Sequence, residues 1–178
     1  NLHYAGTGAV QHLIHVFVRD VGLDAIKRQV THPLTGLRVA PYYGCQLVRP
    51  RRPDGWDGAG PRFFEDLLAA IGAEPVQFPF RLRCCGASLM ITNRRAGLGM
   101  LRDLLRGATQ KTADLIATTC PLCQMNLECY QADVNREFGT NFSIPVLYFT
   151  QLMGVALGIR PKSLGIGKEL IHAKPVLA

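Results

Sequence analysis

The chain has 178 residues and a net charge of +7, from 20 basic and 13 acidic side chains. Apolar residues make up 48% of it and charged residues 19%, against about 25% charged residues in an average soluble protein. This composition excludes a disordered chain, and the length suits one domain with its own core. The most apolar stretch, residues 149–159, is too short for a membrane span, which needs about 20 residues. The basic residues are dispersed and no nucleic-acid-binding signature is present, so nucleic acid is not an expected partner.

Apolar residues in the first part of the chain recur at helical spacing. Residues 10–21 predict an amphipathic helix, with His12 and His15 on its polar face. Two histidines three residues apart could suit a metal, but we expect this face to meet solvent or a partner. Residues 23–30 predict a second, shorter helix.

Four apolar segments further along predict strands, with helices between them. The predicted strands cover residues 37–43, 74–80, 114–119 and 144–148. The predicted helices cover residues 63–71, 95–109, 120–138 and 150–157, the last of them capped by Thr150. Strands that alternate with helices predict an α/β fold with a mainly parallel sheet and flanking helices. The spacing leaves the order of the strands open.

The cysteines are the most informative residues. They are Cys45, Cys84, Cys85, Cys120, Cys123 and Cys129. The chain is too long and too poor in cysteine for a small disulfide scaffold, and adjacent cysteines are poorly placed to bond each other. All but Cys129 fall between a predicted strand and the next predicted helix. Such junctions share one edge of a parallel sheet, so we expect these five cysteines to converge at the carboxyl edge of the strands.

The spacing of the five cysteines indicates soft-metal chemistry. Cys45 is followed, after 38 residues, by Cys84-Cys85-Gly86, and 34 residues separate Cys85 from Cys120-Pro-Leu-Cys123. Five thiolates exceed the four ligands of a tetrahedral zinc site or of an ordinary cubane iron–sulfur cluster. The pattern therefore indicates an unusual iron–sulfur cluster, or zinc with one thiol left free. Cys129 lies six residues after Cys123, inside a predicted helix, and we expect it to be a packed thiol outside the site.

The segments around these cysteines resemble the cysteine-rich CCG domain found in the B-type subunits of heterodisulfide reductases and in related E-type succinate dehydrogenase proteins. The similar stretches are PYYGCQLVRP at 41–50, RCCGASLM at 83–90, CPLCQMNL at 120–127 and PVLYFTQL at 145–152. The resemblance implies a noncubane [4Fe-4S] cluster, in which cysteine sulfurs also bridge irons. Its implied ligands are Cys45, Cys84, Cys85, Cys120 and Cys123. Zinc is the alternative cofactor, because some relatives bind zinc in one of two such motifs.

The same resemblance implies a place in a larger complex. The chain resembles the C-terminal half of a B-type heterodisulfide reductase protein, with connector helices at 1–36, the CCG iron–sulfur domain at 37–160 and a tail at 161–178. It implies an oxidoreductase of sulfur metabolism that passes electrons to or from a disulfide or thiol substrate at the cluster. The expected partners are a ferredoxin-like iron–sulfur subunit, a flavoprotein subunit and an N-terminal CCG domain if that domain is a separate chain. The expected location is cytoplasmic, or peripheral to a membrane through these partners.

Two other functions stay open at this point. One is an electron-relay accessory subunit of a succinate dehydrogenase or fumarate reductase, and the other is a zinc-stabilised docking module. The low charge content and the apolar helix near residue 150 would fit burial against partner subunits. The arginines at 49, 51 and 52 suit a solvated loop or the docking of an acidic partner or anionic substrate, and Tyr42 and Tyr43 are expected to be packing residues.

Overall fold

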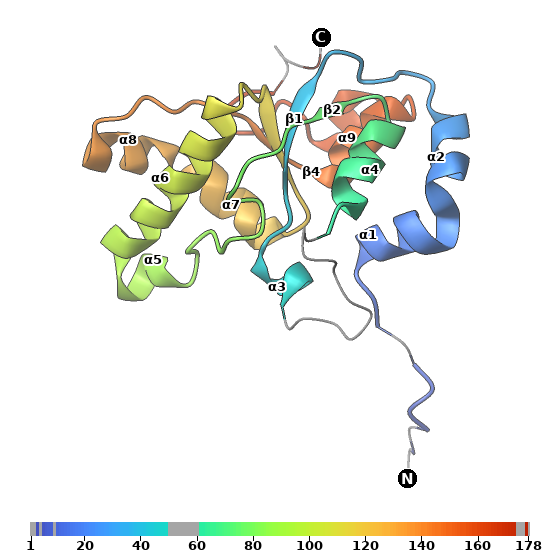
Figure 1. Ribbon diagram of the computed structural model, residues 1–178, viewed down its shortest axis with the longest axis horizontal. Helices are drawn as coiled ribbons and strands as arrows, with labels where there is room; N and C mark the ends of the chain where they lie inside the picture. The colour runs from blue at the N-terminus through green and yellow to red at the C-terminus, as the bar shows by residue number, and fades with distance from the viewer. Residues whose placement is uncertain (1–2, 4, 9, 50–60, 174–176, 178) are drawn as a thin grey trace.

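The computed structural model describes residues 3, 5–8, 10–49, 61–173 and 177, which form a parallel sheet between two layers of helices (Figure 1). The strands are β1 (Arg38–Tyr42), β2 (Glu74–Pro75), β3 (Leu115–Thr118) and β4 (Val146–Tyr148). They lie in the order β2-β1-β3-β4, and each pairing is parallel. The predicted α/β fold with flanking helices is therefore confirmed.

The helices are, in chain order, α1 (Leu13–His15), the π-helical turn η1 (Val16–Gly22), α2 (Leu23–Gln29), α3 (Cys45–Val48), α4 (Phe63–Ala70), α5 (Leu89–Thr92), α6 (Arg94–Gln110), α7 (Pro121–Cys129), α8 (Gln131–Phe138), α9 (Phe149–Ala156) and the 3-10 turn η2 (Pro161–Leu164). Figure 1 shows α2, α4 and α9 on one side of the sheet and α6, α7 and α8 on the other.

Alternating strand residues build two cores, one on each face of the sheet. Val39, Leu115 and Leu147 belong to the core that contains α4 and α9. Their neighbours Ala40 and Ile116 belong to the core that contains α6 and α7. This is the period of two expected for strands that are buried on both faces. The strand pairs Val39↔Leu115 and Ala40↔Ile116 keep each set in register.

The N-terminal helices differ from their predicted pattern. The turn Val16–Gly22 is π-helical, so the 3.6-residue spacing used for the prediction does not hold across it. His15 is buried, and its ring lies 4.8 Å from that of Phe63. The predicted exposed polar face is therefore wrong for His15. Ile14 is also buried, in the core that contains α4 and α9.

Two other segments end earlier than predicted. The strand expected over residues 74–80 forms ladder pairs only at Glu74–Pro75. The helix expected over residues 120–138 is broken at Tyr130, whose φ and ψ are −103° and 10°. There the Gln131 side chain donates to the Leu127 carbonyl at 3.0 Å, in place of the backbone N–H that would continue the helix.

The last helix turns its apolar residues into the chain's own core. Leu152, Met153 and Ala156 are buried there, so the expectation that this helix is apolar in order to meet a partner is wrong. The predicted cap at Thr150 is also wrong, because α9 begins at Phe149 and the Gln151 side chain accepts from the Tyr148 N–H at 2.8 Å. In the described part of the chain, no helix combines the length and the hydrophobicity required to cross a bilayer.

Candidate metal centre

The first cysteine of the motif begins α3, directly after β1. Gly44 precedes it with φ +71°, a backbone conformation that favours glycine. A Cβ atom at Gly44 would lie 3.3 Å from Cys123 Sγ and 3.4 Å from Cys120 Cβ. The backbone beside Cys45 therefore packs directly on two other cysteines of the motif.

Cys120 and Cys123 stand at the start of α7, directly after β3. Cys120 is the N-cap, Pro121 occupies the first turn, and Cys123 is the third helical residue. The N-terminus of a helix carries partial positive charge, which stabilises thiolates and bound anionic groups. In a sheet of order β2-β1-β3-β4, the crevice beyond the ends of β1 and β3 is the usual ligand position. Cys45 and Cys120 follow these two strands.

The backbone just before Cys120 is fixed by three contacts from other segments. Tyr148 donates its hydroxyl to the Thr119 carbonyl at 3.0 Å, and His12 Nε2 lies 3.2 Å from the same oxygen. The Thr119 hydroxyl in turn donates to the Tyr43 carbonyl at 2.8 Å. His12 was predicted to lie on a surface face, and the structure instead connects it to the strand end that leads to Cys120.

The paired cysteines lie in a turn between β2 and α5. Gly86 follows them with φ +79°, and a Cβ atom there would lie 3.1 Å from the Gly97 Cα of α6. Only a residue without a side chain allows this close approach of the turn to the helix. The Gly86 N–H donates to Cys84 Sγ at 3.4 Å. Because β2 is short, the pair lies nine residues beyond its end.

Two buried side chains hold the turn, one through the backbone before the paired cysteines and one through the backbone within the pair. Tyr42 donates its hydroxyl to the Arg83 carbonyl, which precedes the pair, at 2.5 Å. Asn126 donates its amide to the Cys85 carbonyl at 3.0 Å. Asn126 is missed by reasoning from the sequence, where it is one polar residue of a helix. Its position three residues after Cys123 is the signal that could have drawn attention to it.

Contacts between the thiols connect the three cysteine segments. Cys85 Sγ and Cys123 Sγ are 3.5 Å apart. The Cys45 thiol interacts with that of Cys84, and the Cys123 thiol with that of Cys120. All are free thiols, with Cys85 and Cys123 buried and the other three partly exposed. The structure thus brings together the five cysteines that the sequence singled out.

The thiols influence one another's charge. The pKa of Cys85 is lowered to about 6, mainly by the hydrogen bond between its sulfur and that of Cys123. The pKa of Cys123 is raised by that same hydrogen bond and by burial. Burial, followed by the nearby charges of Cys85, Cys123, Cys84 and Cys45, raises the pKa of Tyr42. Four of the five sulfurs are therefore close enough for their charge to act on the Tyr42 hydroxyl.

The donor set fits a soft metal. Within the described residues, no three histidine, cysteine or acidic side chains already form an arrangement that could hold a metal ion. The five sulfurs are nevertheless the donors that iron–sulfur clusters and zinc select, and two of them are withdrawn from solvent. Binding of a metal by this set requires that the thiols lose their protons.

Cys129 falls outside this cluster of cysteines. It is exposed rather than packed, and the Glu128 carboxylate is a charged group near its thiol. Of the predicted arginine group, Arg49 is exposed, whereas Arg51 and Arg52 lie outside the described residues. Cys129 therefore adds no ligand to the site.

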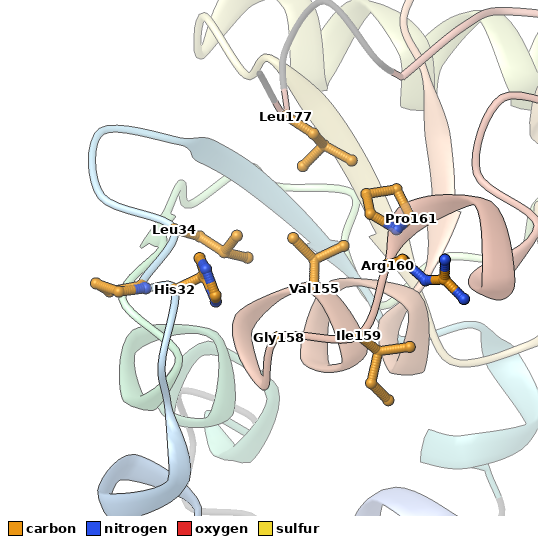
Figure 2. A pocket seen from close by; sticks show the side chains of 9 residues that line it. His32, Leu34, Val155, Gly158, Ile159, Arg160, Pro161 and Leu177 are labelled. Atoms are coloured by element: carbon orange, nitrogen blue, oxygen red, sulfur yellow. The ribbon is translucent and has the colours of Figure 1, made fainter.

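Of two cavities in the structure, the smaller is the one beside the cysteines. A groove of about 380 Å³ lies between the segment before β1 and the end of α9, where Leu34, Val155 and Leu177 line it (Figure 2). Its lining includes no cysteine. A smaller cavity of about 70 Å³ has Cys84 and Arg83 in its wall. The smaller cavity is therefore the one that borders a clustered cysteine.

Comparison with known proteins agrees with the cysteine pattern. The sequence model of a family described as the CCG cysteine-rich domain matches residues 39–128. The chain is 36% identical over 180 residues to the B-type subunit of the ferredoxin/F420H2-dependent CoB-CoM heterodisulfide reductase of Methanosarcina acetivorans, covering 99% of this chain and 60% of that protein. It is also 36% identical over 174 residues to the 8-methylmenaquinol:fumarate reductase membrane anchor subunit of Wolinella succinogenes, covering 97% of this chain and 61% of that protein.

The chain thus spans about three-fifths of the length of these relatives. A crystal structure of a hypothetical protein from Helicobacter pylori has the same fold, with a TM-score of 0.65 and 13% identity over 85% of this chain and 28% of that one. The family match covers all five clustered cysteines. The chain belongs to the cysteine-rich CCG-domain family.

Proposed function

We propose that this chain is an iron–sulfur redox subunit of a heterodisulfide-reductase-like complex. In this proposal Cys45, Cys84, Cys85, Cys120 and Cys123 hold a noncubane [4Fe-4S] cluster, at which electrons pass to or from a disulfide or thiol substrate. Reduction of a disulfide consumes two electrons and two protons and yields two thiols, and oxidation runs the same balance in reverse. When bound, the cluster supplies one-electron transfer and a metal to which a sulfur substrate can bind.

The observation that carries the proposal is the meeting of five free thiols from three separate segments. Cys85 and Cys123 are 3.5 Å apart, and the other three join them through the contacts described above. Five sulfurs are one more than a tetrahedral zinc or a cubane cluster uses. Relatives that are 36% identical are named as subunits of a heterodisulfide reductase and of a fumarate reductase, both of which are redox enzymes.

The protein's own residues have three tasks in this proposal. The first turn of α7 and the N–H of Gly86 stabilise negative charge on the sulfurs, the latter through its 3.4 Å contact with Cys84. The buried positions of Cys85 and Cys123 exclude water from one side of the site. Cys45, Cys84 and Cys120 remain partly exposed, which leaves the other side open to a substrate or partner.

The surface of this side also suits contact with other subunits. Leu122 and Met125 on α7 are 53% and 50% exposed, and Ile91 on α5 is 94% exposed. All three lie within six residues of a clustered cysteine. We propose that a ferredoxin-like iron–sulfur subunit docks here, and that a flavoprotein subunit and an N-terminal CCG domain complete the complex. Such an assembly would lie in the cytoplasm or reach a membrane through its partners.

The similarity to a fumarate reductase subunit favours one alternative. In it, the same cysteines relay electrons within a fumarate reductase or succinate dehydrogenase and do not act on a disulfide. Affinity purification of the chain from its native cells separates the two functions. Recovery of a flavin-binding disulfide reductase subunit supports our proposal, and recovery of a fumarate reductase or succinate dehydrogenase flavoprotein supports the alternative.

Metal analysis of anaerobically purified protein tests the proposal itself. We expect a brown protein with about four irons and four acid-labile sulfides per chain. One zinc without sulfide would exclude the cluster and favour a zinc-stabilised docking module.

A further inference from the structure

We propose that Tyr42 and Asn126 are positioning residues that tie the Cys84–Cys85 turn to the other two cysteine segments, and that Asn126 also tunes the reduction potential of the group bound there. The inference deepens the proposed function and rests on the same five cysteines. It concerns residues outside the motif, for which neither the cysteine pattern nor the names of the relatives gives a role.

Tyr42 acts on the backbone before the pair. It is the last residue of β1 and lies three residues before Cys45. Its side chain is fully buried, and its hydroxyl donates to the Arg83 carbonyl at 2.5 Å. The bond ties the paired cysteines to the strand that carries Cys45. A buried hydroxyl without an acceptor is costly, so the Tyr42 hydroxyl favours the position of the turn in which this bond is made.

Asn126 acts on the backbone within the pair. It lies on α7 three residues after Cys123, and its side chain is 1% exposed. Its amide donates to the Cys85 carbonyl at 3.0 Å. The bond ties the paired cysteines to the helix that carries Cys120 and Cys123. The two side chains together therefore fix the turn relative to both of the other cysteine segments.

The carbonyl that Asn126 holds belongs to a residue whose sulfur lies beside another clustered thiol. Cys85 Sγ is 3.5 Å from Cys123 Sγ, and Cys123 is on the same helix as Asn126. The bond to the Cys85 carbonyl therefore fixes the position of this residue relative to Cys123 and keeps a polar amide next to it. The groups around the sulfurs are one of the ways in which a protein sets the potential of an iron–sulfur cluster, so loss of the amide should shift that potential.

Two variants and a matched control test this inference on anaerobically purified protein. Tyr42→Phe removes the hydroxyl, and Asn126→Leu removes the amide at nearly constant volume. Gln131→Met is the control, because Gln131 is also a buried amide that donates to backbone carbonyls, those of Leu127 at 3.0 Å and Ile144 at 2.8 Å. Its contacts lie away from the cysteines.

The first measurement is backbone hydrogen exchange of the peptide covering residues 81–90, followed by mass spectrometry. We expect about fivefold faster exchange in Tyr42→Phe and in Asn126→Leu, as the loss of one hydrogen bond predicts, and no change in the control. Unchanged exchange in both variants, or an equal increase in the control, overturns the positioning role.

The second measurement is the midpoint potential from a redox titration followed by electron paramagnetic resonance. We expect a shifted potential in Asn126→Leu, a smaller change in Tyr42→Phe and none in Gln131→Met. A potential that is unchanged in Asn126→Leu overturns the tuning role. If Asn126→Leu fails to load a cluster, Tyr42→Phe and the exchange data still decide the positioning role. If the wild-type protein contains zinc and no sulfide, the cluster and the tuning role both fail, while hydrogen exchange still tests the positioning separately.

Discussion

Tyr42 and Tyr43 are neighbours at the end of β1 and are both fully buried, yet they serve opposite faces of the sheet. Tyr42 lies in the core with α6 and α7, and its hydroxyl interacts electrostatically with four of the clustered sulfurs. Tyr43 lies in the core with α4 and α9, where its hydroxyl donates to the carboxylate of Glu65 and also lies 3.0 Å from the Pro61 carbonyl oxygen. Two tyrosines one residue apart therefore have different surroundings: one lies beside the clustered cysteines and the other belongs to a structural network.

The network around Tyr43 is a buried ion pair. Glu65 is 2% exposed, and its carboxylate is 3.2 Å from the Arg81 guanidinium. The Tyr43 N–H also donates to the Arg81 carbonyl at 3.1 Å, so backbone and side-chain bonds join the same two residues of this network. The face with Tyr43 thus stabilises the fold, and the face with Tyr42 positions the clustered cysteines. Substitutions on each face should therefore change different measurements.

The largest effect is expected at the metal centre. Cys84→Ser should reduce the iron and sulfide content from about four of each per chain to nearly none, since the alkoxide of serine is a poor replacement for a soft thiolate. Cys129→Ser is the matched control, because that thiol is exposed and lies outside the cluster of cysteines. Iron and sulfide assays on both proteins measure the effect. A loss of iron in Cys129→Ser would contradict the division into five cysteines and one.

The next largest effect is expected in the buried ion pair. Arg81→Met leaves the Glu65 carboxylate buried without its cation, which typically costs about 3 kcal/mol. For a chain of this size that should lower Tm by roughly 6–12 °C. Arg95→Met is the control, since Arg95 pairs with Glu137 at the surface, where its side chain is 83% exposed. An exposed pair contributes about 0.2–1 kcal/mol, so equal shifts of Tm in the two variants would contradict a structural role for the buried pair.

A smaller effect separates the two tyrosines directly. Tyr43→Phe removes a donor from the buried Glu65 carboxylate and should cost about 1–3 kcal/mol of the free energy of unfolding. Its midpoint potential and iron content should equal those of the wild type. In Tyr42→Phe the main change should instead be at the site, as faster hydrogen exchange around the paired cysteines. Thermal unfolding and redox titration of both variants measure the difference, and a shifted potential in Tyr43→Phe would show that the two faces are not independent.

Sequence reasoning succeeded where a pattern depends on local spacing. The cysteine motif identified the five residues that converge, because each stands in a segment with a recognisable neighbour such as Gly86 or Pro121. The alternation of strands and helices was sufficient for the fold class. Strand order and the short β2 could not be predicted, since they depend on which strands pair and not on their own composition.

The side chains that support the site were harder to identify. Asn126 and His12 resemble ordinary polar helix residues in the sequence, and their roles come from contacts with Cys85 and Thr119. His15 is a similar case, because it is buried against Phe63, a residue far away in the sequence. Contacts between distant segments are fixed by tertiary packing, which a period along the chain does not encode.

The smallest predicted effect is a pH dependence that belongs to Tyr43. Burial and the hydrogen bond to Glu65 raise the pKa of Tyr43 above its ordinary value of 10. Above pH 10 the unfolded chain therefore releases this proton while the folded chain retains it. The folded state then binds more protons, so the free energy of unfolding falls as pH rises. One such group accounts for a loss of about 1.4 kcal/mol between pH 9 and pH 11.

Denaturant unfolding of the wild type and Tyr43→Phe at pH 9, 10 and 11 isolates this contribution. The wild type also contains Tyr42, whose pKa is raised as well, so both proteins should lose stability above pH 10. Tyr43→Phe should lose about 1.4 kcal/mol less over this range, because phenylalanine has no proton to release. Parallel curves for the two proteins would mean that Tyr43 ionises alike in the folded and unfolded chain. In that case the hydrogen bond to Glu65 would not hold the proton, and the structural network on this face would depend on Arg81 alone.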